Sequence, residues 1–455
     1  MRRRAARTTT LAPEPPSVPG HPILGNALQF MRDPVALLRQ GAEEHGRVFS
    51  VRLGNKPAVV LLGPEHTRFF FEETDKLLSI REAYPFFRKM FHENLYFFAD
   101  PPEYKEQRKI LIPPFQGRKL SGYIDAMTKE MRAFGTRLGD SGEFDLAPTL
   151  APLIMDINAS SLLGSDCREE LGPSFLPEFH RFREGTEFVL PLWLPIPRLL
   201  RSQAAKKRLH AMLSDLLARR RAVPREPADL IQTLAEARYS DGRAVPDHII
   251  VNMILVLQWA GYETTTGQTS WALIELLRNP EYLRSVVAEQ DAVLADDPER
   301  RLDTLTRLER LGWGVSESVR LHPMAFLMMR AAAADFEVAG FHVRKGSLVL
   351  ASPAVSQRLS DVFPDPDAFH PERFAAERRD GTQHSGMIAF GGGLHRCVGM
   401  HYANLVMKVV IGYLLENFEL ELVDPDPGKG SGSKPRWPIS PCRVRYQRRK
   451  SEGAL

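Results

Sequence analysis

The chain has 455 residues, 43% of them apolar and 25% charged, which is typical of a soluble globular protein with a sizeable buried core. The net charge is only +4, which argues against nucleic acid as a partner. The cysteines (Cys167, Cys397 and Cys442) have no paired or CxxC spacing, so we expect no disulfide framework, no zinc site and a reducing, cytoplasmic location.

The N-terminal segment 1–22 is predicted to be a tail that ends in the proline-rich run 13–20, because proline is excluded from helix and sheet interiors. Three arginines follow Met1, but no apolar stretch follows them, so no secretory signal is expected. No run of about 20 apolar residues is found elsewhere, so no transmembrane anchor is expected. Residues 23–455 contain no linker and are predicted to form one domain.

The first predicted elements are two strands, 47–53 and 58–62, which are rich in β-branched residues and flank Gly54-Asn55 as a hairpin. From residue 64 to about 325 the pattern is helical. The longest helix should begin near Pro246-Asp247 and end before Asn279-Pro280, since proline in a first turn and Asn-Pro at a stop are boundary signals.

The C-terminal part of the chain is predicted to contain the remaining strands. The sequence therefore predicts a mainly α fold, with a large helical body and a small β-sheet region. The strands are expected at 336–343, 347–350, 418–423 and 443–446, and the apolar run 324–329 ends at Arg330.

The middle of the longest helix has an unfavourable helical sequence, from Ala260 to Thr265. Glycine at 261 costs about 1 kcal/mol relative to alanine, and threonine at 264 can bond back to a carbonyl. We therefore expect a local opening of the helix here. Glu263 and Thr264 could act there as proton donors and acceptors. The alternative is a solvated glutamate and a helix-bending threonine with no role.

Two further motifs contain opposite charges. Glu317 and Arg320 lie three residues apart on one predicted helical face, and Arg373 lies in a Pro-Glu-Arg-Phe motif. Such pairs contribute little on a surface. We expect the three residues to meet in the interior as a mutually satisfied network with a structural role.

Aromatic residues are dense between Tyr84 and Phe98. A plain core explains such a segment, but so does the wall of an apolar ligand pocket. Together with the apolar run 188–197, the segment indicates a large lipophilic ligand. The residues predicted to line this pocket are Phe86, Phe87, Phe91, Tyr96, Leu257, Ala260, Phe326 and Met328.

The most informative cysteine is Cys397, which follows a glycine-rich turn (Phe390 to Gly393) and precedes a predicted apolar helix at 403–415. Glycines allow the backbone to approach a flat ligand and supply amide donors to the sulfur. Taken alone, Cys397 is better explained as a small buried hydrophobic residue, as free cysteines often are.

Four motifs in this order resemble the cytochrome P450 family. The resemblance implies the cytochrome P450 fold and makes residues 23–455 a haem-thiolate catalytic domain. It also implies haem b (iron protoporphyrin IX) with Cys397 as the ligand of the haem iron, where a thiolate favours O–O cleavage. The motifs are the helix segment 260–265, Glu317-x-x-Arg320, Pro371-Glu372-Arg373-Phe374 and the cysteine loop 390–399.

The same resemblance implies O2 as co-substrate and electrons from NAD(P)H through a separate partner, either ferredoxin with ferredoxin reductase or another donor. Ala260 and Gly261 would then lie beside the haem, and Glu263 with Thr264 would deliver protons. Basic residues could dock an acidic ferredoxin, although a solvated helix face explains them equally well. They are Lys105, Lys109, Arg118 and Lys119.

Within the family, the chain is similar to the sterol 14α-demethylase branch. That similarity implies propionate contacts for Tyr84, Arg330 and His395. Arg108 and Tyr104 are further candidates, and Phe390 and Gly391 would lie against the haem. The residues that carry the similarity are Tyr84-Pro85-Phe86, Phe91, Ser270-Trp271, Leu273 to Leu276, Met329-Arg330, Ala351 to Ala354 and His395 to Gly399.

The chain departs from this branch at Glu263, where the branch has histidine, and at His92 and Asn94, where it has glycines. Tyr104 also replaces the usual tryptophan or histidine. Our hypothesis is a haem-thiolate monooxygenase that inserts one oxygen atom from O2 into a bulky lipophilic substrate (a terpenoid, steroid or similar lipid). The alternatives are a sterol 14α-demethylase proper, a peroxygenase or isomerase on the same fold, and a non-enzymatic haem sensor. The Glu263-Thr264 pair weighs against the last two.

Overall fold

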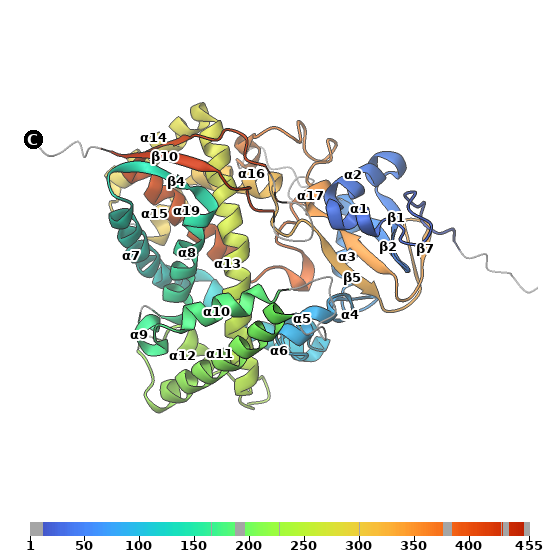
Figure 1. Cartoon of the computed structure of the whole chain (residues 1–455), viewed down its shortest axis with the longest axis horizontal. Helices are drawn as coiled ribbons and strands as arrows, with labels where there is room; N and C mark the ends of the chain where they lie inside the picture. The colour runs from blue at the N-terminus through green and yellow to red at the C-terminus, as the bar shows by residue number, and fades with distance from the viewer. Residues whose placement is uncertain are drawn as a thin grey trace, which may run out of the picture.

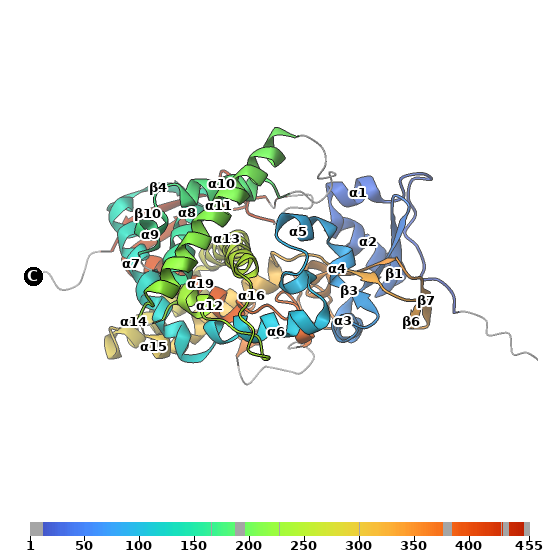
Figure 2. The same cartoon turned by 90° about the horizontal axis from the view of Figure 1, so that it is seen from below.

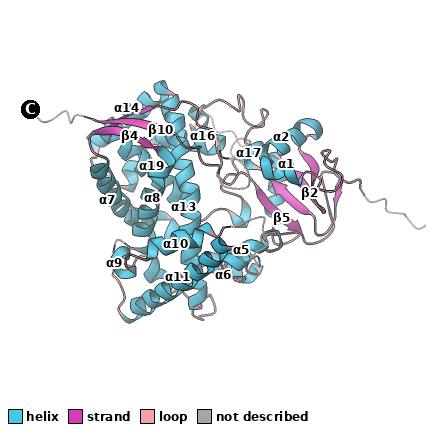
Figure 3. Ribbon diagram, in the orientation of Figure 1, coloured by secondary structure: helices cyan, strands magenta, loops and turns pink. Residues whose placement is uncertain are grey.

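The computed structural model describes residues 12–164, 166–186, 196–226, 228–299, 301–375, 385–428, 430 and 436–449, without the side chains of Cys167 and Arg168. Helices and sheets occupy different parts of the molecule: the helices form most of one side, and the larger sheet lies on the other (Figures 1 and 3). The predicted mainly α fold is confirmed. Most of the apolar run predicted at 188–197 lies outside the described residues.

Helices cover most of the described chain. The α-helices are α1 (Ala27–Arg32), α2 (Pro34–His45), α3 (Gly63–Glu72), α4 (Ile80–Ala83), α5 (Pro85–Met90), α6 (Pro101–Leu111), α7 (Ser121–Leu138), α8 (Leu146–Asn158), α9 (Cys167–Leu171), α10 (Phe175–Glu184), α11 (Pro197–Ala222), α12 (Leu230–Ala235), α13 (Asp247–Arg278), α14 (Pro280–Asp296), α15 (Leu302–Arg307), α16 (Glu309–Leu321), α17 (Pro353–Ser356) and α19 (Met400–Asn417). Short 3₁₀ turns are η1 (Tyr96–Phe98), η2 (Pro113–Phe115), η3 (Gly117–Leu120), η5 (Pro371–Phe374) and η7 (Gly393–His395), and η4 (Ala159–Leu163) is a π-helical turn.

The strands form a five-stranded sheet in the order β1-β2-β8-β5-β3, a three-stranded sheet in the order β4-β10-β9, and the hairpin β6-β7. All pairs are antiparallel except β2 with β8. The strands are β1 (Val48–Leu53), β2 (Lys56–Leu61), β3 (Leu78–Ser79), β4 (Ser141–Asp145), β5 (Met328–Ala332), β6 (Phe336–Val338), β7 (Phe341–Val343), β8 (Leu348–Ala351), β9 (Phe418–Leu422) and β10 (Arg443–Arg448).

The first predicted hairpin is confirmed, with Leu53 opposite Lys56 across the Gly54-Asn55 turn. The single strand predicted at 336–343 is wrong. Ala339 and Gly340 both adopt positive φ (51° and 79°), which turns the chain back on itself and makes the segment a hairpin.

The longest helix, α13, has the predicted bounds and runs through the middle of the helical part, so that Figure 2 looks nearly along its axis. The predicted local opening is absent, because the helix is continuous from Asp247 to Arg278. The Thr264 hydroxyl donates to the Ala260 carbonyl oxygen at 2.6 Å, so the threonine is accommodated within the helix.

One segment, Leu146–Leu163 in α8 and η4, is long and apolar enough for a membrane span, with a mean hydropathy of 1.3. In this fold, however, 78% of the segment is buried inside the protein, as a core helix of a soluble protein would be. It is therefore weak evidence for a membrane anchor.

The proline-rich run packs on the five-stranded sheet. The Ser50 amide donates to the Pro16 carbonyl at 2.7 Å, and the Val18 amide donates to the Ser50 carbonyl at 3.0 Å. The side chain of Val18 is only 2% exposed. Residues 16–18 are thus part of the folded body, whereas the sequence predicted a tail through residue 22.

Candidate functional site

The cysteine loop is held in a fixed shape by backbone contacts. The Cys397 amide donates to the Phe390 carbonyl at 2.9 Å, and Gly391 and Gly393 adopt φ values of 72° and 58° that favour glycine. A Cβ at Gly392 would lie 2.5 Å from the ring of Phe71. The loop therefore presents Cys397 just before the first turn of α19.

The Cys397 side chain is accessible to solvent, while surrounding protein atoms still desolvate it. This desolvation raises the pKa of its thiol, and the backbone amide of Gly399 and the charges of Arg108 and Arg396 lower it. An accessible sulfur enclosed by protein indicates a recess into which a ligand can reach.

Arg330 is a buried cation at the centre of β5, only 5% exposed. Its Nε donates to Thr74 Oγ1 at 3.0 Å, and its Nη1 donates to the Met329 carbonyl at 2.8 Å. Among the described residues it has no ion-pair partner, and burial lowers its pKa to about 10. The Met329 amide also donates to the Tyr84 hydroxyl at 2.9 Å, which places Tyr84 beside this cation.

A second group of polar side chains joins α6 to the cysteine loop. The Tyr104 hydroxyl donates to the Leu394 carbonyl at 2.9 Å, and Arg108 Nη1 donates to the Arg396 carbonyl at 3.0 Å. The His395 ring stacks on Tyr104 with centroids 4.2 Å apart. Tyr104 and Arg108, two of the predicted propionate contacts, thus bind the backbone of the cysteine loop close to Cys397.

The partner of His395 was not identified in the sequence. His395 Nε2 lies 2.6 Å from Asp75 Oδ2, and its buried Nδ1 has no hydrogen-bond partner among the residues that the structure describes. Asp75 adopts a φ of 71° just after α3. Burial lowers the pKa of His395, and the Asp75 carboxylate opposes this effect.

These observations fit haem. Within the described residues, Arg330 is a buried guanidinium without a carboxylate partner, and an unpaired buried charge is costly unless a ligand supplies the counter-charge. The free Nδ1 of His395 is a second unsatisfied group near the same charges. Two propionates and a thiolate-ligated iron match this donor set.

The middle of α13 is less buried than the stretches on either side of it. Leu257, Ala260 and Thr264 follow one another at helical spacing and are half-buried or exposed, whereas 249–256 and 265–276 are buried throughout. Because the stretches on both sides of these positions are buried, the accessibility in the middle is expected where the helix borders an internal space.

Asn158 ties this part of α13 to α19. Its backbone carbonyl accepts from Gln258 Nε2 at 3.2 Å, and its Oδ1 accepts from the Tyr402 hydroxyl at 3.0 Å. A Cβ at Gly261 would lie 3.2 Å from Asn158 Nδ2, so glycine permits the close approach of α8. Because Tyr402 follows Cys397 by five positions, the accessible part of α13 lies near the cysteine loop.

An aromatic group lies against the same part of α13. The Phe87 ring meets Trp259 edge-on at 5.2 Å, and Phe91 meets the same indole at 6.0 Å. Phe86 contacts Phe87 at 5.3 Å between centroids. The Tyr96 hydroxyl accepts from Arg108 Nη1 at 2.9 Å, which links this group to the cysteine loop.

Two of the predicted pocket residues, Phe326 and Met328, pack against the sheet region. Phe326 is 8% exposed and packs in the cluster of α2, β1 and β2, with the guanidinium of Arg436 5.5 Å from its ring centroid. Met328 packs against the cluster that contains Phe70 and Phe71. Phe326 lies just before β5 and Met328 is its first residue, so both belong to the sheet region.

Glu263 is paired with a residue that was not identified from the sequence, Arg183 of α10. The Arg183 guanidinium also lies 4.6 Å from the ring centroid of Tyr262. The Trp437 indole donates to the Glu263 backbone carbonyl at 2.9 Å. Glu263 is therefore held by an ion pair and is not simply solvated.

The structure brings Glu317, Arg320 and Arg373 together in the interior. Arg320 Nε and Nη2 donate to the two Glu317 carboxylate oxygens, each at 2.8 Å, and Arg373 Nε donates to Glu317 Oε1 at 3.1 Å. Arg320 and Glu317 are fully buried, and the network joins α16 to η5.

Comparison with known proteins gives the family. The family model of Cytochrome P450 matches residues 15–436. The chain is 34% identical over 437 residues to a sterol 14alpha-demethylase of Mycolicibacterium vanbaalenii, covering 93% of this chain and 96% of that protein. It is 31% identical over 442 residues to a sterol 14-demethylase of Arabidopsis thaliana, covering 94% of this chain and 90% of that protein.

Solved structures agree in fold. A retinoic acid bound cyanobacterial CYP120A1 superposes with a TM-score of 0.85 at 26% identity, covering 97% of this chain and 100% of that chain. The match in sequence and the match in fold both extend over nearly the whole chain. This chain therefore belongs to the cytochrome P450 family and is a cytochrome P450 monooxygenase, an oxidoreductase that uses O2 at a haem-thiolate centre with electrons from a partner.

Proposed function

We propose that this enzyme inserts one oxygen atom from O2 into a bulky lipophilic substrate, a terpenoid, steroid or similar lipid. The observation that carries the proposal is the accessible centre of α13, which lies near the cysteine loop and beside the aromatic group around Phe87. An aromatic, mostly apolar surface with few polar groups suits a lipid. The names of the relatives concern sterols, and that of the structural neighbour concerns retinoic acid, which agrees with this substrate class.

In this proposal the cofactor is haem b, with Cys397 as the iron ligand. Arg330 and His395 would neutralise the propionates, with Tyr84, Tyr104 and Arg108 as neighbouring donors. Phe390 and Gly391 would support the ring from the cysteine side, and Ala260 and Gly261 would adjoin it on the opposite side. When bound, haem supplies the activation of dioxygen.

Thr264 and Glu263 supply the protons in this proposal. Thr264 Oγ1 lies on the accessible face of α13 and donates to Ala260, so its proton is available to a group in the recess by rotation about one bond. Glu263 is about one-fifth exposed and paired with Arg183, so it can exchange protons with solvent when that pair opens. Arg183 is a positioning residue for Glu263.

Replacing Thr264 with alanine should uncouple electron use from product formation. We expect product formed per NAD(P)H consumed to fall at least about tenfold, because loss of one positioned proton donor typically costs about 10²–10⁴-fold in the step it serves. The readout is product and peroxide measured against NAD(P)H. Thr269→Ala, which removes a buried hydroxyl of the same helix, is the matched control. Unchanged coupling in Thr264→Ala would contradict the role.

Electrons would come from NAD(P)H through a ferredoxin and its reductase, in the cytoplasm. Lys105, Arg118 and Lys119 are exposed, as docking of an acidic ferredoxin requires. Lys109 is also exposed but is engaged by Glu106 at 2.6 Å.

A second candidate function is sterol 14α-demethylation proper, which the names of the relatives favour and the Glu263–Arg183 pair leaves open. A spectral titration of the ferric protein decides between them. The compounds tested are a panel of polycyclic terpenoids and steroids and a 14α-methyl sterol. We expect a saturable spin-state shift with at least one polycyclic terpenoid or steroid. A shift with the sterol, followed by demethylated product, would establish the second candidate. No shift with any lipid would contradict the substrate class.

A further inference from the structure

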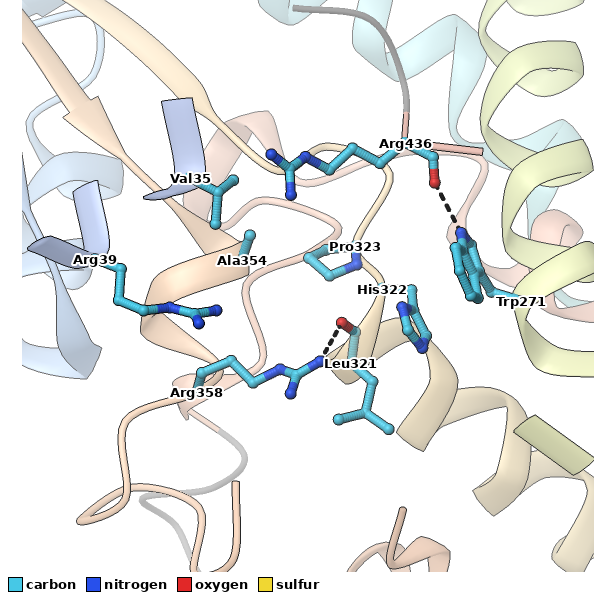
Figure 4. A pocket seen from close by; sticks show the side chains of 9 residues that line it. All are labelled: Val35, Arg39, Trp271, Leu321, His322, Pro323, Ala354, Arg358 and Arg436. Atoms are coloured by element: carbon cyan, nitrogen blue, oxygen red, sulfur yellow. Dashed lines mark hydrogen bonds between the residues drawn. The ribbon is translucent and has the colours of Figure 1, made fainter. Parts of the chain in front are cut away.

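A small cavity of about 40 Å³ lies away from the recess, where α2, the end of α16 and α17 meet. Figure 4 shows that three arginines approach this cavity from different sides: Arg39 from α2, Arg358 from the segment after α17, and Arg436 from the segment before β10. The remaining lining is mostly apolar and includes Val35 and Pro323. The haem site proposed above uses none of these arginines.

The positive charges at this cavity exceed the described negative ones. Arg436 pairs with Asp33 and Arg358 pairs with Asp367, and these carboxylates are 42% and 79% exposed. Arg39 has no carboxylate within ion-pair distance in the described part of the chain. Burial lowers the pKa of Arg358, and the neighbouring charge of Arg39 lowers it further.

Arg436 has an additional unsatisfied group. Its side chain is 15% exposed, and its buried Nε has no hydrogen-bond partner in the described part of the chain. Its backbone carbonyl accepts from the Trp271 indole at 2.7 Å, which fixes the main chain at this point. A guanidinium that is held in place with a free donor is ready to bind an acceptor.

We propose that this cavity binds a phosphate-sized oxyanion. A carboxylate has two oxygens in one plane, and a single arginine can bind both of them. Donors that arrive from three sides match a tetrahedral anion, which has oxygens in several directions. A cavity of about 40 Å³ exceeds the roughly 10–15 Å³ needed for one water, and it leaves room for the anion without a large organic substituent.

The position of the cavity gives the anion a structural consequence. Arg436 precedes Trp437, whose indole donates to the Glu263 carbonyl at 2.9 Å. The cavity is also lined by His322, which stacks on Trp271 of α13 with centroids 4.1 Å apart. A bound oxyanion would therefore hold α2, the end of α16 and the Arg436 segment together beside α13. This proposal does not depend on the substrate or the haem assignment.

The test is thermal unfolding of the purified holoenzyme with increasing inorganic phosphate at constant ionic strength, balanced with sodium chloride. We expect a saturable rise in the midpoint, because a ligand that binds only the folded state stabilises it. Arg39→Gln should raise the apparent dissociation constant for phosphate about tenfold or more, since it removes a charge-assisted donor. Arg39 is exposed, so this variant should fold normally.

Arg284→Gln is the matched control, because Arg284 is a 72% exposed arginine of α14 that does not line the cavity, and it should leave the phosphate response unchanged. Glycerol phosphate serves as a second probe. A response to inorganic phosphate alone supports a site for the free anion, and an equal response to glycerol phosphate supports a phosphomonoester site. No saturable response at constant ionic strength, or an equal response in Arg39→Gln, overturns the proposal.

Discussion

Cys397→Ser should abolish the thiolate-type ferrous–CO spectrum and reduce turnover more than about 100-fold. Changes in groups that only orient a metal ligand already cost about 10–100-fold, and this substitution removes the ligand itself. The serine hydroxyl is a poor donor to the iron. The loop would still place this side chain correctly, because the hydrogen bond from the backbone amide of residue 397 to the Phe390 carbonyl and the positive φ values at Gly391 and Gly393 do not depend on the sulfur. The loss should therefore be chemical, with the fold preserved.

Cys442→Ala is the control for this experiment. Cys442 is 1% exposed and precedes β10, and its backbone amide donates to Asp145 Oδ1 at 3.0 Å. Its loss should leave the CO spectrum intact, at a cost in stability of about 1 kcal/mol for the small cavity. A Cys397→Ser protein that retains the thiolate spectrum, measured beside this control, would show that another residue ligates the iron.

Glu317→Ala should lower the free energy of unfolding by about 3–5 kcal/mol, the range observed when one partner of a buried ion pair is removed. The Glu317 carboxylate accepts from Arg320, from Arg373 and from the His370 amide at 2.9 Å. Arg320 also donates to backbone carbonyls such as that of Gln357 at 2.9 Å, so its position is fixed. Alanine would leave two guanidinium groups buried near each other without a counter-charge.

The matched control for this prediction is Glu281→Ala. Glu281 and Arg284 have the same residue types and the same spacing on α14, but they are 93% and 72% exposed and 4.0 Å apart. Removal of an exposed partner should change stability by less than about 1 kcal/mol. Urea unfolding followed by circular dichroism gives both values. Equal losses in the two variants would contradict the view that burial determines the importance of the pair.

Local sequence signals predicted several elements well, because these signals act on the backbone within a few residues of their own position. Proline at 246 and Asn-Pro at 279 marked both ends of α13, because they act on the backbone of their own turn. The Gly54-Asn55 turn fixed the register of β1 and β2 in the same way. The glycine loop around Cys397 was likewise recognisable, since both its backbone geometry and its sulfur lie within one decapeptide.

Other features required the tertiary structure. The expected break in α13 was wrong because the cost of Gly261 and Thr264 is offset by contacts from elsewhere: Asn158 fills the space beside the glycine, and the threonine bonds to Ala260. Phe326 resembled a pocket residue in the sequence, yet the chain carries it into the cluster beneath Arg436.

The sequence by itself determined the chemistry available to this protein: a thiolate behind a glycine turn, an acid–alcohol pair in a long helix, and an aromatic segment. Only the tertiary structure decided which charges meet. Glu263 pairs with Arg183 and His395 with Asp75, across 80 and 320 positions of the chain. Helical and strand periodicity encode which face of an element is buried, but not the distant element that covers it. Partners of buried polar groups are therefore fixed by packing.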